Sequence, residues 1–249
     1  MKKICTTFLW IAQIIAAEPP RTVPPNQWAE FTLNGQIPIF SCYRNDSYPP
    51  EHPIVYDFET VEQLKQKALA KERNYYGETD TFLYAALEAY PIRGKTVAIM
   101  GSNIPWYEAI VLAYGGKPVT IEYNRIVSTH SDLTVMTVDD YDAHPEMFDA
   151  VISISSYEHD GLGRYGDPID PRGDLKAMER TKKMLRPEGV LFLAVPIGRD
   201  LLAWNVHRVY GTKRFPILIE GWEIVHSFGF QESDFQRDEQ GFQPVFVLK

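Results

Sequence analysis

The sequence predicts an α/β fold built on a Rossmann-like, mostly parallel sheet, and three observations predict it. An apolar run at Thr96–Met100 stops at Gly101, and the helix-compatible segment Pro105–Tyr114 follows. A second apolar run, Val119–Ile121, ends on an acid, Glu122. Apolar runs and amphipathic segments then continue to alternate, an order that gives parallel strands joined by right-handed crossovers.

Four more strands and three more helices are expected along the rest of the chain. The strands lie at Leu133–Val138, Phe148–Ser153, Val190–Val195 and Phe242–Leu248, and the helices at Tyr141–Met147, Asp174–Leu185 and Gly221–Phe228. These elements place the α/β domain at residues 95–249, and residues 26–94 then form an N-terminal extension.

Two helices are expected in the N-terminal extension. The first opens with a Thr-x-x-Gln capping box at Thr60 and runs to about Asn74. The second starts near Thr79 and carries apolar residues on one face. Both could form a lid or brace over the α/β core, or pack on it as ordinary amphipathic helices. Before them, four prolines in residues 18–25 predict a stiff linker.

The first 17 residues have the pattern of a signal peptide. Lys2 and Lys3 precede a mostly apolar stretch, Ile4–Ala17, that ends in small residues. This stretch is short for a bilayer-spanning helix, which needs about 20 residues. We expect secretory targeting or a short membrane anchor at residues 4–17; the alternative is a cytoplasmic protein with this segment packed as a helix. Asn45-Asp46-Ser47 is a permissible glycosylation acceptor.

Charge and cysteine content exclude several classes of function. A net charge of -8 and a pI near 5.3 argue against a nucleic-acid partner, which calls for a basic surface. The two cysteines, Cys5 and Cys42, provide neither a metal ligand set nor a disulfide framework. Small molecules or sugars are therefore the expected partners.

Gly101 and Glu122 have the spacing of a nucleotide-binding crevice. The first strand-to-helix turn of a doubly wound sheet faces the ligand, and an acid about 20 residues on can bind ribose hydroxyls. The alternative for Glu122 is a surface acid paired with Arg125.

The loop after the fourth strand carries many side chains suited to chemistry. His159 could act as a general base because an ordinary histidine pKa lies near neutrality, or it could simply hold the loop. Asp160, Arg164 and Asp167 are candidates for substrate contact. The loop emerges at the same sheet edge as Gly101, and long loops in compact domains are usually functional.

A further candidate region follows the fifth strand. If the chain from Trp204 onward is helical, Arg208 could bind a substrate carboxylate or phosphate, with His207 beside it. A salt bridge from Arg208 to a core acid is the alternative.

Two segments carry a resemblance to a known family. Phe148–Ser153 and the turn at Leu185–Gly189 resemble the "FDxV" strand and "LxPGG" turn of class I S-adenosylmethionine-dependent methyltransferases. Residues 156–168 and 205–211 resemble, more narrowly, the Caenorhabditis-type protein family of unknown function, a divergent branch of that fold. The resemblance covers roughly residue 95 to the end and implies a methyltransferase-type sheet whose C-terminal strand is antiparallel.

The resemblance implies that S-adenosylmethionine lies over Gly101 and Ser102, with its ribose on Glu122. Asp139 matches the place where such enzymes contact adenine, although acids after a strand also cap helices. His159 or His207 would take the proton of the acceptor.

The first loop departs from the family pattern. Ile99 stands where these enzymes carry an acid, and Asn103 and Pro105 stand where they carry later glycines. The expected activity is methyl transfer to a small or glycan-like acceptor. A non-catalytic protein that has lost the cofactor and a sugar-nucleotide enzyme are the alternatives.

Overall fold

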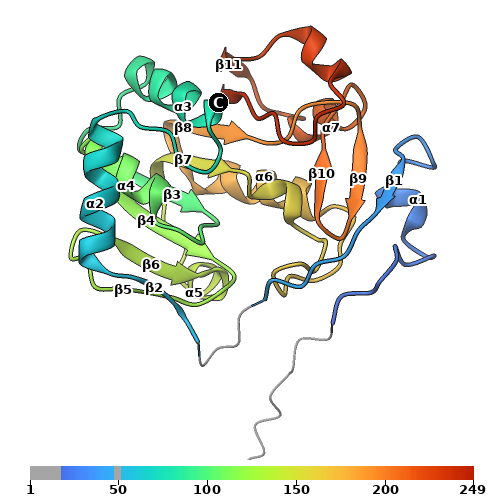
Figure 1. Ribbon diagram of the computed structural model, residues 1–249, viewed down its shortest axis with the longest axis horizontal. Coiled ribbons are helices and arrows are strands. Elements are labelled where there is room, and N and C mark those ends of the chain that lie inside the picture. The colour runs from blue at the N-terminus through green and yellow to red at the C-terminus, as the bar shows by residue number, and fades with distance from the viewer. Residues whose placement is uncertain (1–17, 48–51) are drawn as a thin grey trace, which may run out of the picture.

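A seven-stranded sheet forms the centre of the computed structural model, which describes residues 18–47 and 52–249 (Figure 1). Its order is β11-β12-β8-β7-β3-β4-β6. The strands are β3 (Thr96–Met100), β4 (Lys117–Glu122), β6 (Thr134–Thr137), β7 (Phe148–Ile154), β8 (Leu185–Ala194), β11 (Ile224–Phe228) and β12 (Val245–Leu248). Only β12 pairs antiparallel with its neighbours in this sheet. The predicted fold, with its antiparallel C-terminal strand, is confirmed.

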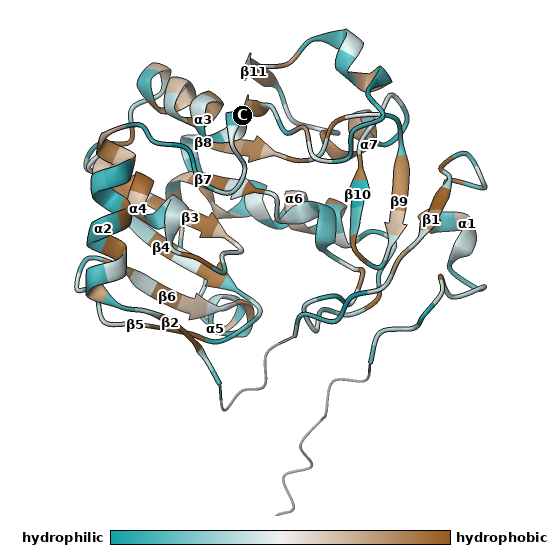
Figure 2. Ribbon diagram, in the orientation of Figure 1, coloured by the Kyte–Doolittle hydropathy of each residue, from teal (hydrophilic) through white to brown (hydrophobic). Residues whose placement is uncertain are grey.

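Helices cover both faces of the sheet. One face carries α2 (Phe58–Leu69), α3 (Glu78–Ala89) and α4 (Trp106–Ala113); the other carries α5 (Val138–Ala143), α6 (Gly173–Met184) and α7 (Arg214–Leu218). Successive strand residues point to opposite faces. Ala98 therefore packs in one core and Val97 in the other. Figure 2 shows apolar residues concentrated on the central strands.

The N-terminal segment packs against residues 201–209, which lie far from it in the sequence. After α1 (Trp28–Phe31), β1 (Ile39–Ser41) pairs parallel with β9 (Leu201–Trp204), and β9 pairs antiparallel with β10 (His207–Val209) (Figure 1). A separate pair joins β2 (Ile54–Tyr56) to β5 (Ile126–Ser128).

Residues 18–25, expected as a linker, lie against the domain. The Trp204 indole donates to the Pro20 carbonyl at 3.0 Å, and Phe31 packs edge-on to Trp204 at 5.1 Å between ring centroids. The predicted signal segment, residues 1–17, falls outside the described residues. No helix in the described ranges has the length and apolar character to cross a membrane.

Three local predictions are wrong. Gly221–Phe228, expected as a helix, ends in strand β11, because its residues complete the edge of the sheet beside β12. The chain from Trp204 forms the β9–β10 hairpin instead of a helix, because its residues pair across the strands. Helix α2 starts after Asp57, whose carboxylate accepts the Thr60 N–H at 2.8 Å, so Asp57 is the N-cap in place of Thr60.

Candidate functional site

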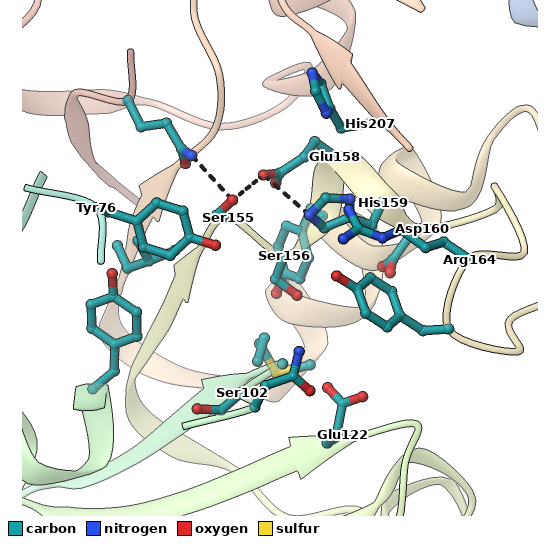
Figure 3. Close-up of a pocket in the computed structure, with 18 of the residues that line it drawn as sticks. Tyr76, Ser102, Glu122, Ser155, Ser156, Glu158, His159, Asp160, Arg164 and His207 are labelled. Carbon is teal, nitrogen blue, oxygen red and sulfur yellow. Dashed lines mark hydrogen bonds and ion pairs between the residues drawn. The ribbon is translucent and has the colours of Figure 1, made fainter. Parts of the chain in front are cut away.

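A cavity of about 870 Å³ opens at the carboxyl ends of β3, β4 and β7. This is the edge at which open α/β sheets bind ligands. Its walls also include residues 74–77 ahead of α3, residues 240–243 ahead of β12, and Arg44 from the N-terminal segment. In Figure 3, Ser102 and Glu122 lie on one side of this space, and Ser155, Glu158 and His159 lie on the other.

Gly101 occupies a position that only glycine fits. Its φ is +70°, in the left-handed region that side chains disfavour. A Cβ there would lie 2.6 Å from Ser156 Oγ and 3.4 Å from Glu122 Oε2. Ser156 and Glu122 fill the place where a Cβ would lie, so glycine lets the β3–α4 turn pack close to both, and Ser102 lies beside it in the cavity wall.

Glu122 is a buried acid at the end of β4, unlike the surface acid considered as the alternative. Its side chain is only 8% exposed, and Oε1 accepts from the Asn124 N–H at 3.2 Å and from Asn124 Nδ2 at 3.3 Å. Burial raises the pKa of Glu122, and the N–H groups of Asn124 and Ser102 oppose that shift. A carboxylate here can accept hydrogen bonds from a ligand diol.

A second buried glutamate, Glu108, holds the β3–α4 turn through a hydrogen bond from Ser102. Its Oε1 accepts from Thr120 Oγ1 at 2.7 Å and its Oε2 from Ser102 Oγ at 3.2 Å. Burial raises its pKa from 4.5 to about 7. The Tyr56 hydroxyl also donates to the Ser102 carbonyl at 2.8 Å. The sequence analysis did not single out Glu108, although an acid inside the apolar segment Pro105–Tyr114 was a visible sign.

Glu158, in the loop after β7, is fully buried and faces the other side of the cavity. Ser155 Oγ donates to its Oε1 at 2.5 Å, and His159 Nε2 lies 3.6 Å from the same oxygen (Figure 3). Its Oε2 has no hydrogen-bond partner. Burial raises the pKa of Glu158 to about 7, while Ser155 opposes the shift. The sequence placed Glu158 in a functional loop without assigning it a role.

The two histidines line the same wall. His159 Nδ1 lies 2.6 Å from the Val206 carbonyl, so this nitrogen carries the proton and donates. Burial, helped by Arg164, lowers the pKa of His159 to about 3, away from the near-neutral value expected. Burial also lowers the pKa of His207, whose Nε2 has no partner.

Arg164 and Arg44 bring positive charge to this wall. Arg164 binds Asp46 through Nε and Nη2, both at 2.7 Å, and stacks over the Tyr165 ring at 4.8 Å. Arg44 is exposed, and its backbone is fixed by Asn205, which accepts the Arg44 N–H at 2.9 Å and donates to its carbonyl at 2.8 Å. The N-terminal segment thus completes the cavity.

The cavity contains seven of the ten candidate residues from the sequence. These are Gly101, Ser102, Glu122, His159, Asp160, Arg164 and His207. The other three lie elsewhere. Asp139 is exposed on α5 beyond the cavity rim, and Asp167 accepts the N–H groups of Gly161 and Gly163 at 2.7 and 3.0 Å, so it holds the loop.

Arg208 does not line the cavity, so the structure does not support the substrate-binding role considered for it from the sequence. Its Nη1 donates to the Asp160 carbonyl at 2.6 Å, and its Nε lies 3.7 Å from Asp174 Oδ2 in the protein interior. This is the core salt bridge given as the alternative. Among residues 18–47 and 52–249, no cluster of three His, Cys, Asp or Glu side chains could hold a metal ion.

Comparison with known proteins agrees with this architecture. A family model described as "Caenorhabditis protein of unknown function, DUF268" matches residues 94–241. The structure is similar to a 1,6-didemethyltoxoflavin-N1-methyltransferase of Burkholderia thailandensis solved with S-adenosylhomocysteine, at 14% identity and a TM-score of 0.50, over 84% of this chain and 92% of that one. This likeness shows a methyltransferase-like fold.

Two further solved structures are more distant. The ribosomal protein L11 methylase of Lactobacillus delbrueckii subsp. bulgaricus is 10% identical, with a TM-score of 0.43 over 70% of this chain and 78% of that one. The glycopeptide N-methyltransferase MtfA, solved with S-adenosylhomocysteine, is 12% identical, with a TM-score of 0.47 over 68% of this chain and 88% of that one. No curated protein matches the sequence.

Proposed function

The chain belongs to the Caenorhabditis protein family of unknown function DUF268, and from that premise we propose that it is an S-adenosylmethionine-dependent methyltransferase acting on a small or glycan-like acceptor. The observation that carries the proposal is the pairing of Gly101 with Glu122 at the carboxyl edge of β3 and β4. Gly101 has a backbone conformation that side chains disfavour. A Cβ built on it would lie 3.4 Å from Oε2 of the buried Glu122 carboxylate.

These residues fit the cofactor at its nucleoside end. Glu122 would accept the ribose hydroxyls, and the Gly101–Ser102 backbone would lie against the cofactor. The cofactor would supply a methyl group on a positively charged sulfur. Since positioning supplies much of the rate in such a transfer, the rigid β3–α4 turn, held by Glu108, supports the proposal.

Features of the N-terminus support entry of this chain into the secretory pathway, where glycans are available as acceptors. The signal-like pattern of residues 1–17 and the sequon at Asn45, which is exposed, are both expected of a protein that enters this route. Expression with and without residues 1–17 tests this part: a glycosidase-sensitive mass shift that requires those residues is expected. A chain without this shift that remains in the cytosol would contradict it.

Calorimetry of the purified chain tests whether it binds the cofactor that the proposed activity requires. We expect binding of S-adenosylmethionine and S-adenosylhomocysteine, and weaker or no binding of nucleotide sugars. Glu122→Ala should weaken that binding by about 100-fold, because two hydrogen bonds to a charged acceptor are lost. Glu179→Ala, an exposed acid on α6, is the matched control and should change nothing. Unchanged affinity in Glu122→Ala would contradict the proposal.

A non-catalytic role remains the second candidate on one specific observation. Ile99 is 1% exposed within the core, so the acid found at this place in related enzymes has no counterpart at the end of β3. Asn103 is exposed where a later glycine is usual. If neither cofactor form binds the wild-type chain, this candidate takes first place.

A further inference from the structure

We infer that Glu158 is the residue that accepts the acceptor's proton, and that the acceptor presents a neutral hydroxyl group. This inference rests on the proposed function and assigns a catalytic residue and a substrate class to the same cavity. Neither histidine named from the sequence takes that role.

The first support is an unmade hydrogen bond. Glu158 is fully buried, yet its Oε2 has no partner, whereas its Oε1 accepts from Ser155. An unsatisfied carboxylate oxygen inside a protein is costly, and native structures rarely leave one without a reason. Because Glu158 lines the cavity, a ligand donor can supply the missing bond. Gln243 Oε1 and His207 Nε2, in the same wall, also lack partners.

The second support is the way the Glu158 carboxylate is held. Gln243 Nε2 donates to Ser155 Oγ at 3.1 Å, and Ser155 Oγ donates to Glu158 Oε1 at 2.5 Å (Figure 3). Ser155 has a φ of +50°, a conformation that non-glycine residues seldom adopt and that tends to occur at functional sites. Ser155 and Gln243 are thus positioning residues that hold Oε1 and leave Oε2 without a protein partner.

The histidines are poorly suited to the task. Nδ1 of His159 is committed to the Val206 carbonyl, and its Nε2 lies 3.6 Å from Glu158 Oε1. Burial and Arg164 lower the pKa of His159 to about 3, so it is a weak base at neutral pH. The pKa of Glu158, raised to about 7 by burial, is closer to the value that general-base catalysis favours.

The charges around Glu158 select the class of acceptor. Arg164 and Arg208 face it from the loop and from β10, and both lower its pKa; Tyr76, Tyr165 and Tyr210 face it as neutral hydroxyls, and His159 is neutral beside it. Arg44 adds positive charge to the same cavity. Arg164 is paired with Asp46 and Arg208 with Asp174, so the selection rests on Arg44 and on hydrogen bonding. A neutral hydroxyl can donate to the unpartnered Oε2, whereas a protonated amine would bring a second positive charge beside Arg44. Several unpartnered acceptor atoms in one wall suit a ligand with several hydroxyls, such as a neutral sugar.

The proposed step balances in atoms and charge. The acceptor oxygen forms its new bond to the methyl carbon, the electron pair of the broken bond stays on sulfur, and the hydroxyl proton passes to Glu158 Oε2. Glu158 must therefore be ionised before the step, so turnover should rise with pH through about 7.

The first experiment follows the carboxyl group in the full chain without cofactor. Infrared difference titration should show buried carboxyl groups that ionise near neutrality, with one signal lost in Glu158→Gln and another lost in Glu108→Gln. Saturating methyl glycosides of neutral hexoses should lower the midpoint of the Glu158 signal and leave that of Glu108 unchanged, because a donated hydroxyl stabilises the carboxylate. A Glu158 signal that stays ionised throughout, or does not respond to any glycoside, would overturn the inference.

The second experiment uses turnover and separates this inference from the proposed function. With a glycoside that is methylated, Glu158→Gln should lower kcat by about 100-fold or more while S-adenosylhomocysteine affinity stays within about threefold. Ser155→Ala should move the midpoint of the pH profile of kcat upward, since its hydrogen bond lowers the pKa of Glu158. A purely structural role would lower kcat equally at every pH. Full turnover in Glu158→Gln overturns the base assignment alone; a wild-type chain that binds no cofactor overturns the proposed function and this inference with it.

Discussion

Glu108 and Glu158 are two buried glutamates, one behind the β3–α4 turn and one in the cavity wall, and burial raises the pKa of each to about 7. Glu108, under the β3–α4 turn, accepts a hydrogen bond on both oxygens, from Thr120 and from Ser102. Glu158 accepts one from Ser155 on Oε1 only, and its Oε2 has no partner. Similar burial therefore has different results: Glu108 bonds to two side-chain hydroxyls, from β4 and from the β3–α4 turn, whereas Glu158 leaves one oxygen without a partner.

The two sides of the cavity also differ in how they are built. The side with Gly101 and Glu122 comes from two adjacent parallel strands, β3 and β4, and the loops that follow them. The side with Glu158 gathers Arg44, the loop after β7 and residues 240–243 from distant parts of the chain. We call these, after the roles proposed for them, the cofactor side and the acceptor side. Changes confined to one side should leave the other intact.

Gly101→Ala is expected to have the largest effect, mainly on the cofactor side and to a smaller extent on the loop after β7 through Ser156. A Cβ would lie 2.6 Å from Ser156 Oγ and 3.2 Å from Ser156 Cβ, and a φ of +70° is strained for alanine, so Ser156 or the turn must move. Strain and lost close approach together should weaken S-adenosylhomocysteine binding by about 1000-fold, roughly 4 kcal/mol. Calorimetry measures this loss. Glycoside binding to the acceptor side should weaken much less than S-adenosylhomocysteine binding, because only Ser156 connects the substituted position to that side, and an equal loss would merge the two sides into one.

Glu108→Gln should remove a pH-dependent part of the stability. A carboxyl whose pKa rises from 4.5 to about 7 on folding stabilises the native state below pH 4.5, and that contribution is lost as pH rises through 7. The amplitude is on the order of 3 kcal/mol. Urea unfolding across this range should show a smaller decline in Glu108→Gln than in the wild type. Identical declines would show that Glu108 is already ionised in the native state.

Asn205→Ala should destabilise the acceptor side. The amide is fully buried and makes two hydrogen bonds to the Arg44 backbone, so its loss should cost about 2 kcal/mol and loosen residues 42–47. Hydrogen exchange would reveal faster exchange in this segment. Exchange that increases equally at the β3–α4 turn would contradict the separation of the two sides.

Arg44→Ala is expected to have the smallest effect. Its side chain is exposed, so its charge acts through water, and truncation should change glycoside affinity by less than about fivefold. It should, however, increase the binding of amine-bearing analogues relative to neutral ones, which competition calorimetry can detect. An unchanged ratio would show that Arg44 does not set the charge preference.

The contrast between the sides also explains what the sequence could predict. Gly101 and Glu122 follow apolar runs, and strand periodicity together with the known ligand edge of parallel sheets is enough to bring them together. The prediction of β12 as an antiparallel strand was confirmed as well. The roles assigned to these residues stay predictions.

The acceptor side could not be derived in the same way. Arg208 and Glu158 lie near each other in space, but which of them faces the cavity depends on the β9–β10 hairpin, and the sequence favoured a helix there. Arg44 reaches the cavity only because β1 pairs with β9, a long-range contact without a local sequence pattern. Asp167 looked like a substrate ligand because a carboxylate that holds three loop N–H groups has no distinctive sequence neighbours.

The pairing of β1 with β9 has a consequence for the order in which the protein matures. Ile39 leaves the ribosome early, whereas its partner Leu202 is among the later residues to be made. Since chains emerge N-terminus first, the apolar residues Phe31 and Ile37 stay exposed until Trp204 has been made and can pack against them. Closing so long a loop is slow, so the central sheet should be formed before this strand docks. A newly made chain would then pass through a stage in which the acceptor side of the cavity is incomplete. During this stage a chaperone could bind the exposed N-terminal segment.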